Sequence, residues 1–179
     1  MLAEVIERYT YEDYKLWEGD WELIDGVPVS MAPSPVKNHQ MLVSSLLFEL
    51  YDGLKDCEEC DALSELDYII DSENVVRPDV AVICNEDSDF ITKAPKIIAE
   101  VISPSTSKRD EKVKFEIYQK EGVRYYILVY PQTLTAKVFR LVDEKYKKEG
   151  VFSREKYSFE FDECKVEVDF FEVFKKFIK

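Results

Sequence analysis

The segment from Ile97 to Ile102 contains one ionisable side chain, Glu100, among Ile, Ala and Val residues. A short apolar run of this kind is typical of a β-strand that is buried on both faces of a sheet. Burying a carboxylate without a partner costs several kcal/mol. We therefore expect a compensating group beside Glu100. The alternative is that Glu100 lies on an edge strand and faces water.

The length and composition are those of one globular domain, which we expect to span residues 1–179. Apolar residues make up 46% of the 179 residues and charged residues 34%, enough to bury a substantial core. No apolar run reaches the roughly 20 residues needed to cross a bilayer. The N-terminus carries acids and lacks the pattern of a signal peptide. We expect a cytoplasmic protein that does not associate with membranes.

The chain is strongly acidic, with a formal net charge of −13. Non-specific binding to nucleic acid requires a basic surface, so the overall charge argues against it. The charge is compatible with a metal site, or with a small basic patch within an acidic surface.

The cysteines are Cys57, Cys60, Cys84 and Cys164. Cys57 and Cys60 form a C-x-x-C pair, but a structural zinc ion needs four ligands, and the chain has no second pair and only one histidine. We expect reduced cytosolic thiols on a loop, with no metal bound.

The order of the predicted elements defines the fold class. Thr10 and Asp13 form a capping box before a helix at 11–17. The other predicted elements are a hairpin of strands 21–24 and 27–32, a helix from 36 to about 54, strands 63–71, 75–84 and 95–103, a helix at 108–122, a strand at 124–131, a hairpin at 134–152 and a helix at 168–179. A strand–helix–strand unit requires one parallel pair. The class is α+β with a mixed sheet.

Asp79 is the second acid of interest, because it follows Pro78 at the start of a predicted strand. The segment between that strand and Glu100 is long enough for a hairpin connection. Adjacent antiparallel strands could then hold both carboxylates at one end of the sheet. Paired carboxylate oxygens suit Mg²⁺, which prefers oxygen ligands and keeps several waters. The alternative is that Asp79 is an acid in a turn next to a proline.

The helix after Glu100 adds a lysine. At about 100° per residue, the apolar arc comprises Val113, Ile117 and Tyr118. The opposite, polar side comprises Lys112, Glu116 and Gln119. Lys114 falls inside the apolar arc and could reach the same carboxylates. By their angles on the helix, Asp110 and Glu121 fall inside the arc as well. Alternatively, Asp110 and Lys114 form an ordinary i, i+4 surface pair. If Lys114 is catalytic, we expect Lys114→Ala to keep the fold and abolish cleavage.

The segments "RPDVAVI" and "IIAEVISPSTSKRDEKVKFEIYQKEGVRYYILVYP" resemble the Uma-type, restriction-endonuclease-like branch of the PD-(D/E)XK nuclease superfamily. The segment "WELIDGVPVSMAPSPVKNHQ" is similar to the N-terminal part of that branch. The resemblance covers roughly residues 10–140. It implies a core of helix, three strands, helix and strand, with an N-terminal hairpin and a C-terminal hairpin and helix around it.

The resemblance also implies a site and an activity. Asp79 and Glu100 would bind Mg²⁺ or Mn²⁺, with the Val101 carbonyl as a further ligand. In the superfamily, a lysine usually stands two residues after the second acid, and here that position is Ile102. In this branch the lysine lies on the following helix, which places it at Lys114. Lys112 is the second candidate for this lysine. The implied reaction is metal-assisted endonucleolytic hydrolysis of phosphodiester bonds, with DNA as the expected substrate.

Other residues are weaker candidates around this site. Ser103, Ser105, Lys108 and Arg109 could bind substrate phosphate near the helix N-terminus, although an ordinary polar loop is the alternative. The sole histidine, His39, and the acids Glu22, Glu49 and Asp110 could support the metal site. For His39, a structural role is the alternative.

Two rival functions remain open at this level. One is a binding module that keeps the nuclease fold without catalysis, and the other is a metal-dependent hydrolase of a small substrate. The acidity of the chain favours the second, because a groove for duplex DNA should be basic. A homodimer could create a basic cleft between two copies. The tail "FFEVFKKFI" and the hairpin at 134–152 are the candidate interface segments, with packing on their own core as the alternative.

Overall fold

The computed structural model describes residues 6–31, 35–162 and 164–178, and it is built around a six-stranded mixed sheet with the strand order β10-β9-β8-β7-β6-β3. These strands are β3 (Cys60–Ser64), β6 (Val80–Cys84), β7 (Ile97–Val101), β8 (Tyr125–Tyr130), β9 (Thr135–Val142) and β10 (Lys145–Phe152). The β7–β8 pair is parallel and the other neighbouring pairs are antiparallel. The predicted parallel pair around Glu100 is thus confirmed.

Two smaller sheets flank the central one. The first has the order β2-β1-β5-β4, and the second is a hairpin of β11 and β12. Their strands are β1 (Trp21–Ile24), β2 (Val27–Ser30), β4 (Tyr68–Ile69), β5 (Val75–Val76), β11 (Lys156–Phe161) and β12 (Cys164–Asp169). The β1–β2 pair is the N-terminal hairpin expected from the sequence, and its pairing with β5 anchors it near the start of β6.

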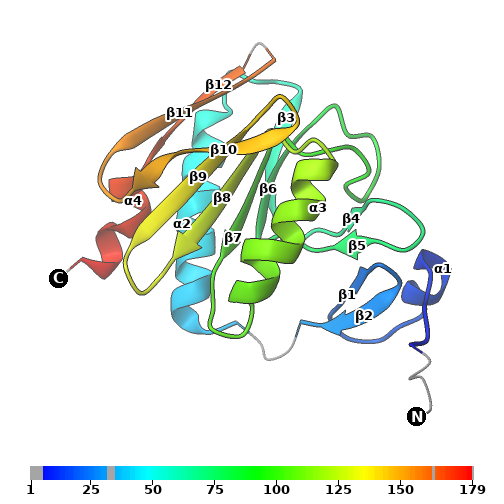
Figure 1. Ribbon diagram of the computed structural model, residues 1–179. Helices are drawn as coiled ribbons and strands as arrows, with labels where there is room; N and C mark the ends of the chain where they lie inside the picture. The colour runs from blue at the N-terminus through cyan, green and yellow to red at the C-terminus, as the bar shows by residue number, and fades with distance from the viewer. Residues whose placement is uncertain (1–5, 32–34, 163, 179) are drawn as a thin grey trace.

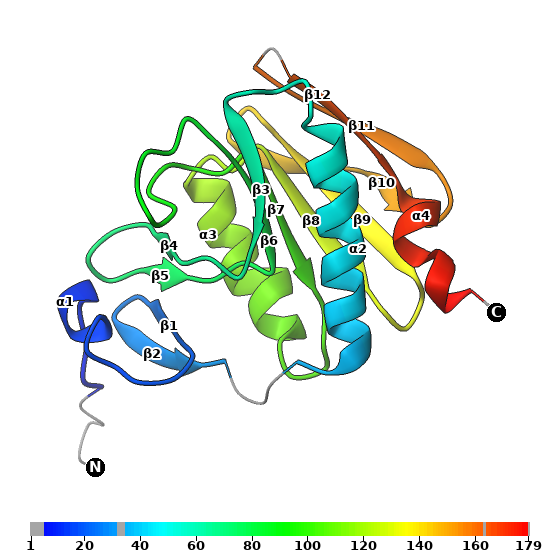
Figure 2. The same cartoon turned by 180° about the vertical axis from the view of Figure 1, so that it is seen from behind.

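The helices cover opposite faces of the central sheet. The two main helical segments are α2 (Lys37–Gly53) and α3 (Phe115–Lys120), and α3 continues a preceding π-helical turn, η1 (Arg109–Lys114). Figure 1 shows α3 in front of the sheet and α2 behind it, and Figure 2 shows the reverse view. The shorter helical segments are α1 (Tyr11–Tyr14), α4 (Phe170–Phe174) and η2 (Lys175–Phe177). No helix in the described ranges is long and apolar enough to cross a membrane.

Alternation along β7 separates two cores. Ile97, Ala99 and Val101 belong to the cluster on the α2 face, which also includes residues of the β11–β12 hairpin and α4. Ile98 belongs to the cluster on the α3 face, together with residues of the small four-stranded sheet. Because successive strand residues point to opposite faces, Glu100 points toward α3 with Ile98. The fold thereby aims this carboxylate at the helix that follows it.

Several sequence expectations about elements need correction. The predicted strand at 63–71 is divided between β3 and β4, which lie in different sheets. The C-terminal helix is short, because 168–169 complete β12 and α4 spans only Phe170–Phe174 before η2. The β11–β12 hairpin was not predicted. Phe170, Val173 and Phe174 are fully buried in this chain's own core. The tail therefore packs within the chain, which was the alternative to an interface with a second copy.

The cysteines also differ from the expectation of reduced thiols on a loop. Cys57 is bonded to Cys164, and Cys60 is bonded to Cys84. Cys60 and Cys84 are cross-strand partners on β3 and β6, whereas the other bond joins the segment between α2 and β3 to β12. The C-x-x-C spacing was misleading because each of its cysteines pairs with a residue distant in sequence.

We expect the Cys57–Cys164 bond to contribute more to stability than the Cys60–Cys84 bond. It closes a span of 107 residues, against 24 for the other bond. In the chain-entropy account, a longer loop loses more freedom in the unfolded state, with typical stabilisation of about 2–4 kcal/mol. Urea unfolding of Cys164→Ser and Cys84→Ser measures the two effects. A larger loss for Cys84→Ser would contradict this ranking.

Glu86 organises the loop between β6 and β7. Its carboxylate accepts hydrogen bonds from the backbone N–H groups of Ser88, Thr92 and Lys93. Burial alone would raise the pKa of Glu86, but these hydrogen bonds outweigh it and lower the pKa to about 2. The loop, which includes Phe90, therefore has a defined shape.

The lowered pKa of Glu86 predicts a pH-dependent difference between the parent and Glu86→Gln. A depressed carboxyl pKa adds stability above the unfolded-state value of 4.5, and this stability disappears as the pH falls toward 2. We expect the parent to be more stable by about 1 kcal/mol at neutral pH, since Glu86 is partly exposed. Urea midpoints at pH 7 and pH 3 measure the difference. An equal gap at both pH values would contradict the prediction.

Candidate active site

Asp79 and Glu100 lie side by side at one end of β6 and β7. The antiparallel register pairs Val80 with Ala99, and continuing it by one residue puts Asp79 opposite Glu100. The Asp79 backbone N–H donates to Glu100 Oε2 at 3.2 Å, and the Val101 N–H donates to Asp79 Oδ2 at 2.7 Å. The two acids therefore contact each other's strand, as expected from a hairpin connection.

Glu22 joins this pair from the N-terminal hairpin. Leu23 on β1 pairs with Val75 on β5, which brings the neighbouring Glu22 next to the segment leading into β6. The Arg77 N–H donates to Glu22 Oε1 at 2.8 Å, and the Glu22 side chain is fully buried. The small sheet thus delivers a third carboxylate to the same end of the central sheet.

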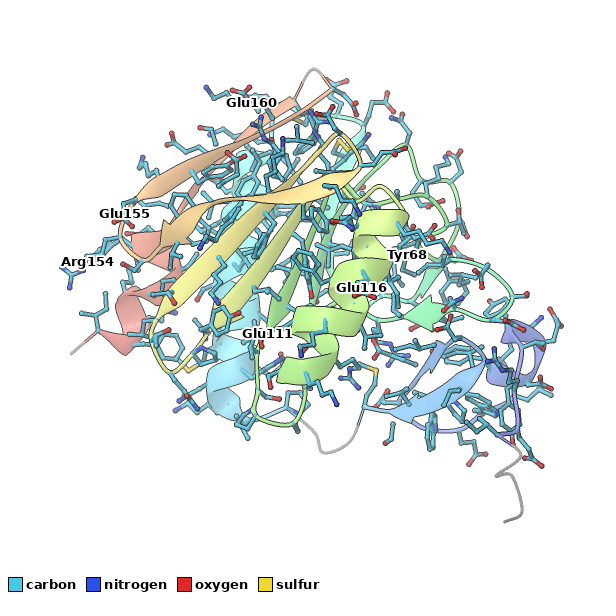
Figure 3. The ribbon with its side chains drawn as sticks, viewed as in Figure 1. Tyr68, Glu111, Glu116, Arg154, Glu155 and Glu160 are labelled. Atoms are coloured by element: carbon cyan, nitrogen blue, oxygen red, sulfur yellow. A yellow bond between two sulfur atoms is a disulfide. The ribbon has the colours of Figure 1, made fainter. Side chains whose placement is uncertain are left out.

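The helical segment after β7 delivers the lysine. Asp110, Lys114 and Tyr118 are 3%, 1% and 0% exposed and form a buried row at i, i+4 and i+8. Val113 is 40% exposed, so its assignment to the buried arc was wrong. Residues 109–114 form a π-helical turn, whose i→i+5 bonds rotate side chains away from the 100° spacing assumed from the sequence. Figure 3 shows Glu116 projecting from the outer face of α3, away from the sheet.

Lys114 Nζ is surrounded by carboxylates. It lies 2.7 Å from Glu22 Oε1, 2.9 Å from Glu100 Oε1 and 3.9 Å from Asp110 Oδ1. It also donates to the Arg77 carbonyl at 3.4 Å. The inward orientation predicted for Lys114 is thus found, and the surface-pair alternative with Asp110 is excluded by burial. Lys114 is the compensating group that Glu100 requires.

Burial and the charges of neighbouring groups together set the ionisation of these side chains. Burial raises the pKa of Glu100 well above its usual value, and the nearby Lys114 charge offsets this only in part. Burial likewise raises the pKa of Asp110. Burial alone would lower the pKa of Lys114, but Glu100, Glu22 and Asp110 together raise it, so the amine stays charged. Carboxylates outnumber cations here, which favours binding of a further cation.

Tyr118 and His39 complete the contacts of the two central acids. The Tyr118 hydroxyl donates to Glu100 Oε1 at 3.0 Å. His39 Nε2 lies 3.2 Å from Asp79 Oδ2. Burial alone would lower the pKa of His39, but the hydrogen bond and charge of Asp79 outweigh it and raise the pKa. His39, near the start of α2, therefore supports Asp79 rather than lying apart from the site.

These groups open into a cavity of about 660 Å³, which we call the main cavity. Asp79, Glu100, Val101 and Lys114 line it, and the phosphate-binding candidates Ser103, Ser105 and Arg109 line its edge with Thr106. Ser103 Oγ lies 3.0 Å from Ser105 Oγ and 3.1 Å from Thr106 Oγ1. The loop after β7 thus presents clustered hydroxyl groups to the cavity.

Two sequence candidates lie elsewhere. Glu49 accepts a hydrogen bond from the Asp169 N–H at 3.2 Å, because its position on α2 faces β12 and α4 rather than the main cavity. Lys108 is exposed and does not line the cavity, since the helical turn directs Arg109 and Asp110 inward instead. The structure therefore does not bring Glu49 or Lys108 to the main cavity.

Two residues of the site were missed from the sequence. The Arg77 N–H donates to Glu22 and its carbonyl accepts from Lys114, while its guanidinium binds Asp67 at 2.7 Å and Asp20 at 2.8 Å. Tyr118 was treated only as an apolar contact of the helix. The position of Arg77 directly before Pro78-Asp79 was the one available signal, since a basic side chain there is adjacent to the predicted acid.

The residues at the main cavity fit a hard divalent cation. Asp79 and Glu100 offer adjacent carboxylates, while Glu22 Oε2 and Asp110 Oδ1 are buried without hydrogen-bond partners. Within residues 6–31, 35–162 and 164–178, no three His, Cys, Asp or Glu side chains are already arranged as metal ligands. Mg²⁺ needs only one or two carboxylates and retains several waters, so a two-carboxylate site suits it.

A helix, three strands, a helix and a strand, with two acids and a lysine at one end of the sheet, define a restriction-endonuclease-like fold. The Uma2 family model, described as "Putative restriction endonuclease", matches residues 11–160. The chain belongs to the Uma2 family. The N-terminal hairpin that carries Glu22 lies within the matched region.

Two further comparisons, one with a solved structure and one with a protein sequence, found similar proteins. A crystal structure described as a putative nuclease belonging to DUF820, from Anabaena variabilis, superposes with a TM-score of 0.69 at 19% identity, covering 83% of this chain and 87% of that one. An uncharacterized protein of Synechocystis sp. is 33% identical over 118 residues. That match covers 60% of this chain and 60% of the relative.

Proposed function

We propose that this protein is a metal-dependent endonuclease that hydrolyses phosphodiester bonds in DNA. The single observation that carries the proposal is the convergence of Asp79, Glu100 and Lys114 on one cavity, in a member of the family described as "Putative restriction endonuclease". The two acids contact each other's strand, and the lysine pairs with one of them. The nuclease description of the DUF820 structure is consistent with the proposal.

In this proposal, Asp79 and Glu100 hold Mg²⁺ or Mn²⁺, with the Val101 carbonyl as a further ligand. A divalent cation in such a position supplies an activated water and neutralises charge on the phosphate. Tyr118 and Lys114 fix the Glu100 carboxylate through hydrogen bonds to Oε1. His39 fixes Asp79 in the same way from α2.

Lys114 also has a part in substrate binding. An ammonium has three donors, and those of Lys114 point to Glu22, Glu100 and the Arg77 carbonyl. The bond to the Arg77 carbonyl is the longest, at 3.4 Å, and is the one most easily exchanged for a phosphate oxygen or the attacking water. A charged donor held in a dry site stabilises developing negative charge strongly.

Arg109 and the hydroxyl cluster are the proposed phosphate-binding groups. Arg109 Nε is buried without a hydrogen-bond partner, at 3.5 Å from Glu22 Oε2. Arg109 lines the main cavity, and its guanidinium could bind a phosphate through paired N–H donors. Ser103 and Ser105 line the same edge and can donate hydrogen bonds to phosphate oxygens.

The two rival functions make different demands on these residues. A binding module without catalysis would not need buried acids around a lysine, since this arrangement adds a desolvation cost without a role. A hydrolase of a small substrate is favoured by the acidity of the chain, and the cavity volume would accommodate such a substrate. Substrate tests must therefore include both nucleic acids and small phosphodiesters.

The function is tested by cleavage assays on the purified chain. We expect cleavage of DNA with Mg²⁺ or Mn²⁺, loss of cleavage in EDTA, and loss of cleavage in Asp79→Asn. Glu116→Gln is the matched control, because Glu116 is an exposed acid on α3 outside the main cavity. Cleavage of bis(p-nitrophenyl) phosphate but of no nucleic acid would favour the small-substrate hydrolase. No cleavage of any substrate would favour the binding module.

The homodimer and the cytoplasmic location expected from the sequence stay predictions. Of the two segments considered for an interface, the tail is largely occupied by packing within the chain, and the hairpin forms β9 and β10 at the edge of the central sheet. Light scattering of the purified chain measures the oligomeric state. A monomer at the concentration used for the cleavage assays would exclude a composite cleft between two copies.

A further inference from the structure

A second cavity beside the main one is lined by aromatic side chains. It has a volume of about 250 Å³, and its walls include Tyr11, Tyr14, Trp17, Trp21 and Phe90. We call it the aromatic pocket. The first four residues come from α1, β1 and their connection, whereas Phe90 comes from the loop organised by Glu86. The proposed catalytic residues do not line this pocket.

The rings of the aromatic pocket hold one another in place. Trp17 packs edge-to-face against Tyr14 at 5.6 Å and against Trp21 at 6.0 Å between centroids. The Tyr14 hydroxyl donates to Asp67 Oδ2 at 2.9 Å and to the Trp21 carbonyl at 3.0 Å. The side chains nevertheless remain partly exposed. The pocket is therefore preformed, which lowers the entropy cost of binding a flat ligand.

The aromatic pocket adjoins the main cavity. Gly19, Trp21 and Arg77 line both. The Arg77 backbone contacts Glu22 and Lys114 on one side, while its guanidinium binds Asp67 on the other. A ligand that extends from the proposed catalytic acids past Arg77 would therefore reach the aromatic rings.

We propose that the aromatic pocket binds an unpaired nucleobase of the strand whose phosphate occupies the main cavity. This inference rests on the proposed function and names its substrate class: DNA with an unstacked base near the cleaved bond. Aromatic side chains stack on bases of any sequence, and truncating one typically weakens binding by about 5- to 150-fold per base. A base inside a duplex is already stacked and cannot enter a pocket.

The size and charge of the molecule favour this occupant. A volume of about 250 Å³ is below the roughly 300–1,000 Å³ of pockets for drug-sized ligands, so the pocket suits a single flat ring system. With a net charge of −13, the chain gains little affinity from contacts along a duplex backbone. Stacking supplies affinity without requiring a basic groove.

The test compares three DNAs of one sequence: a blunt duplex, the same duplex with a single-nucleotide bulge, and the single strand. Binding is measured by fluorescence anisotropy in EDTA, where cleavage cannot occur under the proposed mechanism. We expect the parent chain to bind the bulged and single-stranded DNAs at least 5-fold more tightly than the blunt duplex. Equal affinity for all three, or no binding to any, overturns the inference.

Tyr11 and Phe90 lie on separate walls of the aromatic pocket, and substituting each one tests whether the pocket causes the preference for unpaired DNA. We expect Tyr11→Ala and Phe90→Ala each to weaken binding of the bulged DNA by 5-fold or more and to change blunt-duplex binding by less than 2-fold. Tyr11→Phe should bind like the parent because it keeps the ring. Phe48→Ala is the matched control, since Phe48 is 65% exposed on α2 and lines neither cavity. Parallel losses for all DNAs would contradict a base pocket.

Cleavage of the same DNAs with Mg²⁺ separates this inference from the proposed function. Cleavage of all three DNAs at equal rates, with no effect of Tyr11→Ala, supports the nuclease and overturns the base pocket. Selective binding without cleavage of any DNA overturns the nuclease and supports the pocket. Thermal unfolding of each variant confirms that it is folded. Tyr11 and Phe90 lie on different segments, so if one variant fails to fold, the other still provides the test.

Discussion

Lys114→Met should lower the free energy of unfolding by about 3–5 kcal/mol, the largest stability loss that we expect from one substitution in this chain. Methionine keeps most of the volume but removes the charge that faces Glu22 and Glu100. Both carboxylates are almost fully buried, so they would lose their cation without gaining water. From the sequence, a catalytic Lys114 was expected to allow Lys114→Ala with the fold intact, and the burial of Lys114 changes that expectation.

Urea unfolding measures this effect, with Lys112→Met as the matched control. Lys112 lies on the same π-helical turn and is exposed, so its substitution should change stability by less than about 0.5 kcal/mol. The double variant Lys114→Met, Glu100→Gln should recover part of the loss, because it removes one of the unpaired charges. A loss below 1 kcal/mol for Lys114→Met would mean that the carboxylates are protonated or hydrated despite their burial.

The central pair of acids could be predicted because its signals are local. Glu100 stands out within an apolar strand, and Asp79 follows a proline at a strand start. The segment between them is long enough for a hairpin connection, and β6 and β7 do pair antiparallel. Lys114 could be predicted from helical periodicity, although the π-helical turn made the same calculation misplace Val113.

The rest of the site depends on contacts between distant segments. Glu22 reaches Lys114 only because β1 pairs with β5, more than 50 residues later in the chain. No periodicity within the hairpin reports that pairing, so Glu22 could not be separated from the many other acids of the chain. The same reason explains why the position of Glu49, away from the main cavity, was not predicted. Its helix was predicted correctly, but the face it presents depends on the unpredicted β11–β12 hairpin.

The long-range contacts also change the meaning of the net charge. The overall value of −13 suggested a molecule poorly suited to nucleic acid. In the structure, a share of that charge is concentrated in the main cavity, where Asp79 and Glu100 lie within reach of Glu22 and Asp110. Burial there raises the pKa of Glu100, and the neighbouring carboxylates of Asp79, Asp110 and Glu22 raise it further. The acidity is therefore partly a property of the site.

Glu100→Gln should reduce metal-dependent cleavage by at least on the order of 10³-fold, the largest loss of activity that we expect. The amide keeps the shape and can still accept from Tyr118, but it removes the negative charge that would hold the cation. Unlike Lys114→Met, this substitution leaves no new unpaired charge, because Lys114 retains Glu22 and Asp110. We therefore expect a folded protein with a smaller stability change.

Metal binding gives a second measurement of the Glu100→Gln effect that does not depend on activity. A cation that binds only the folded state stabilises it by about 2.7 kcal/mol at 100 times its dissociation constant. We expect Mn²⁺ to raise the melting temperature of the parent and of Glu116→Gln, and to leave that of Glu100→Gln nearly unchanged. Full stabilisation of Glu100→Gln by Mn²⁺ would remove Glu100 from the proposed ligands. Retained cleavage by a folded Glu100→Gln would contradict the proposed mechanism as a whole, since no other residue of β7 could replace this carboxylate.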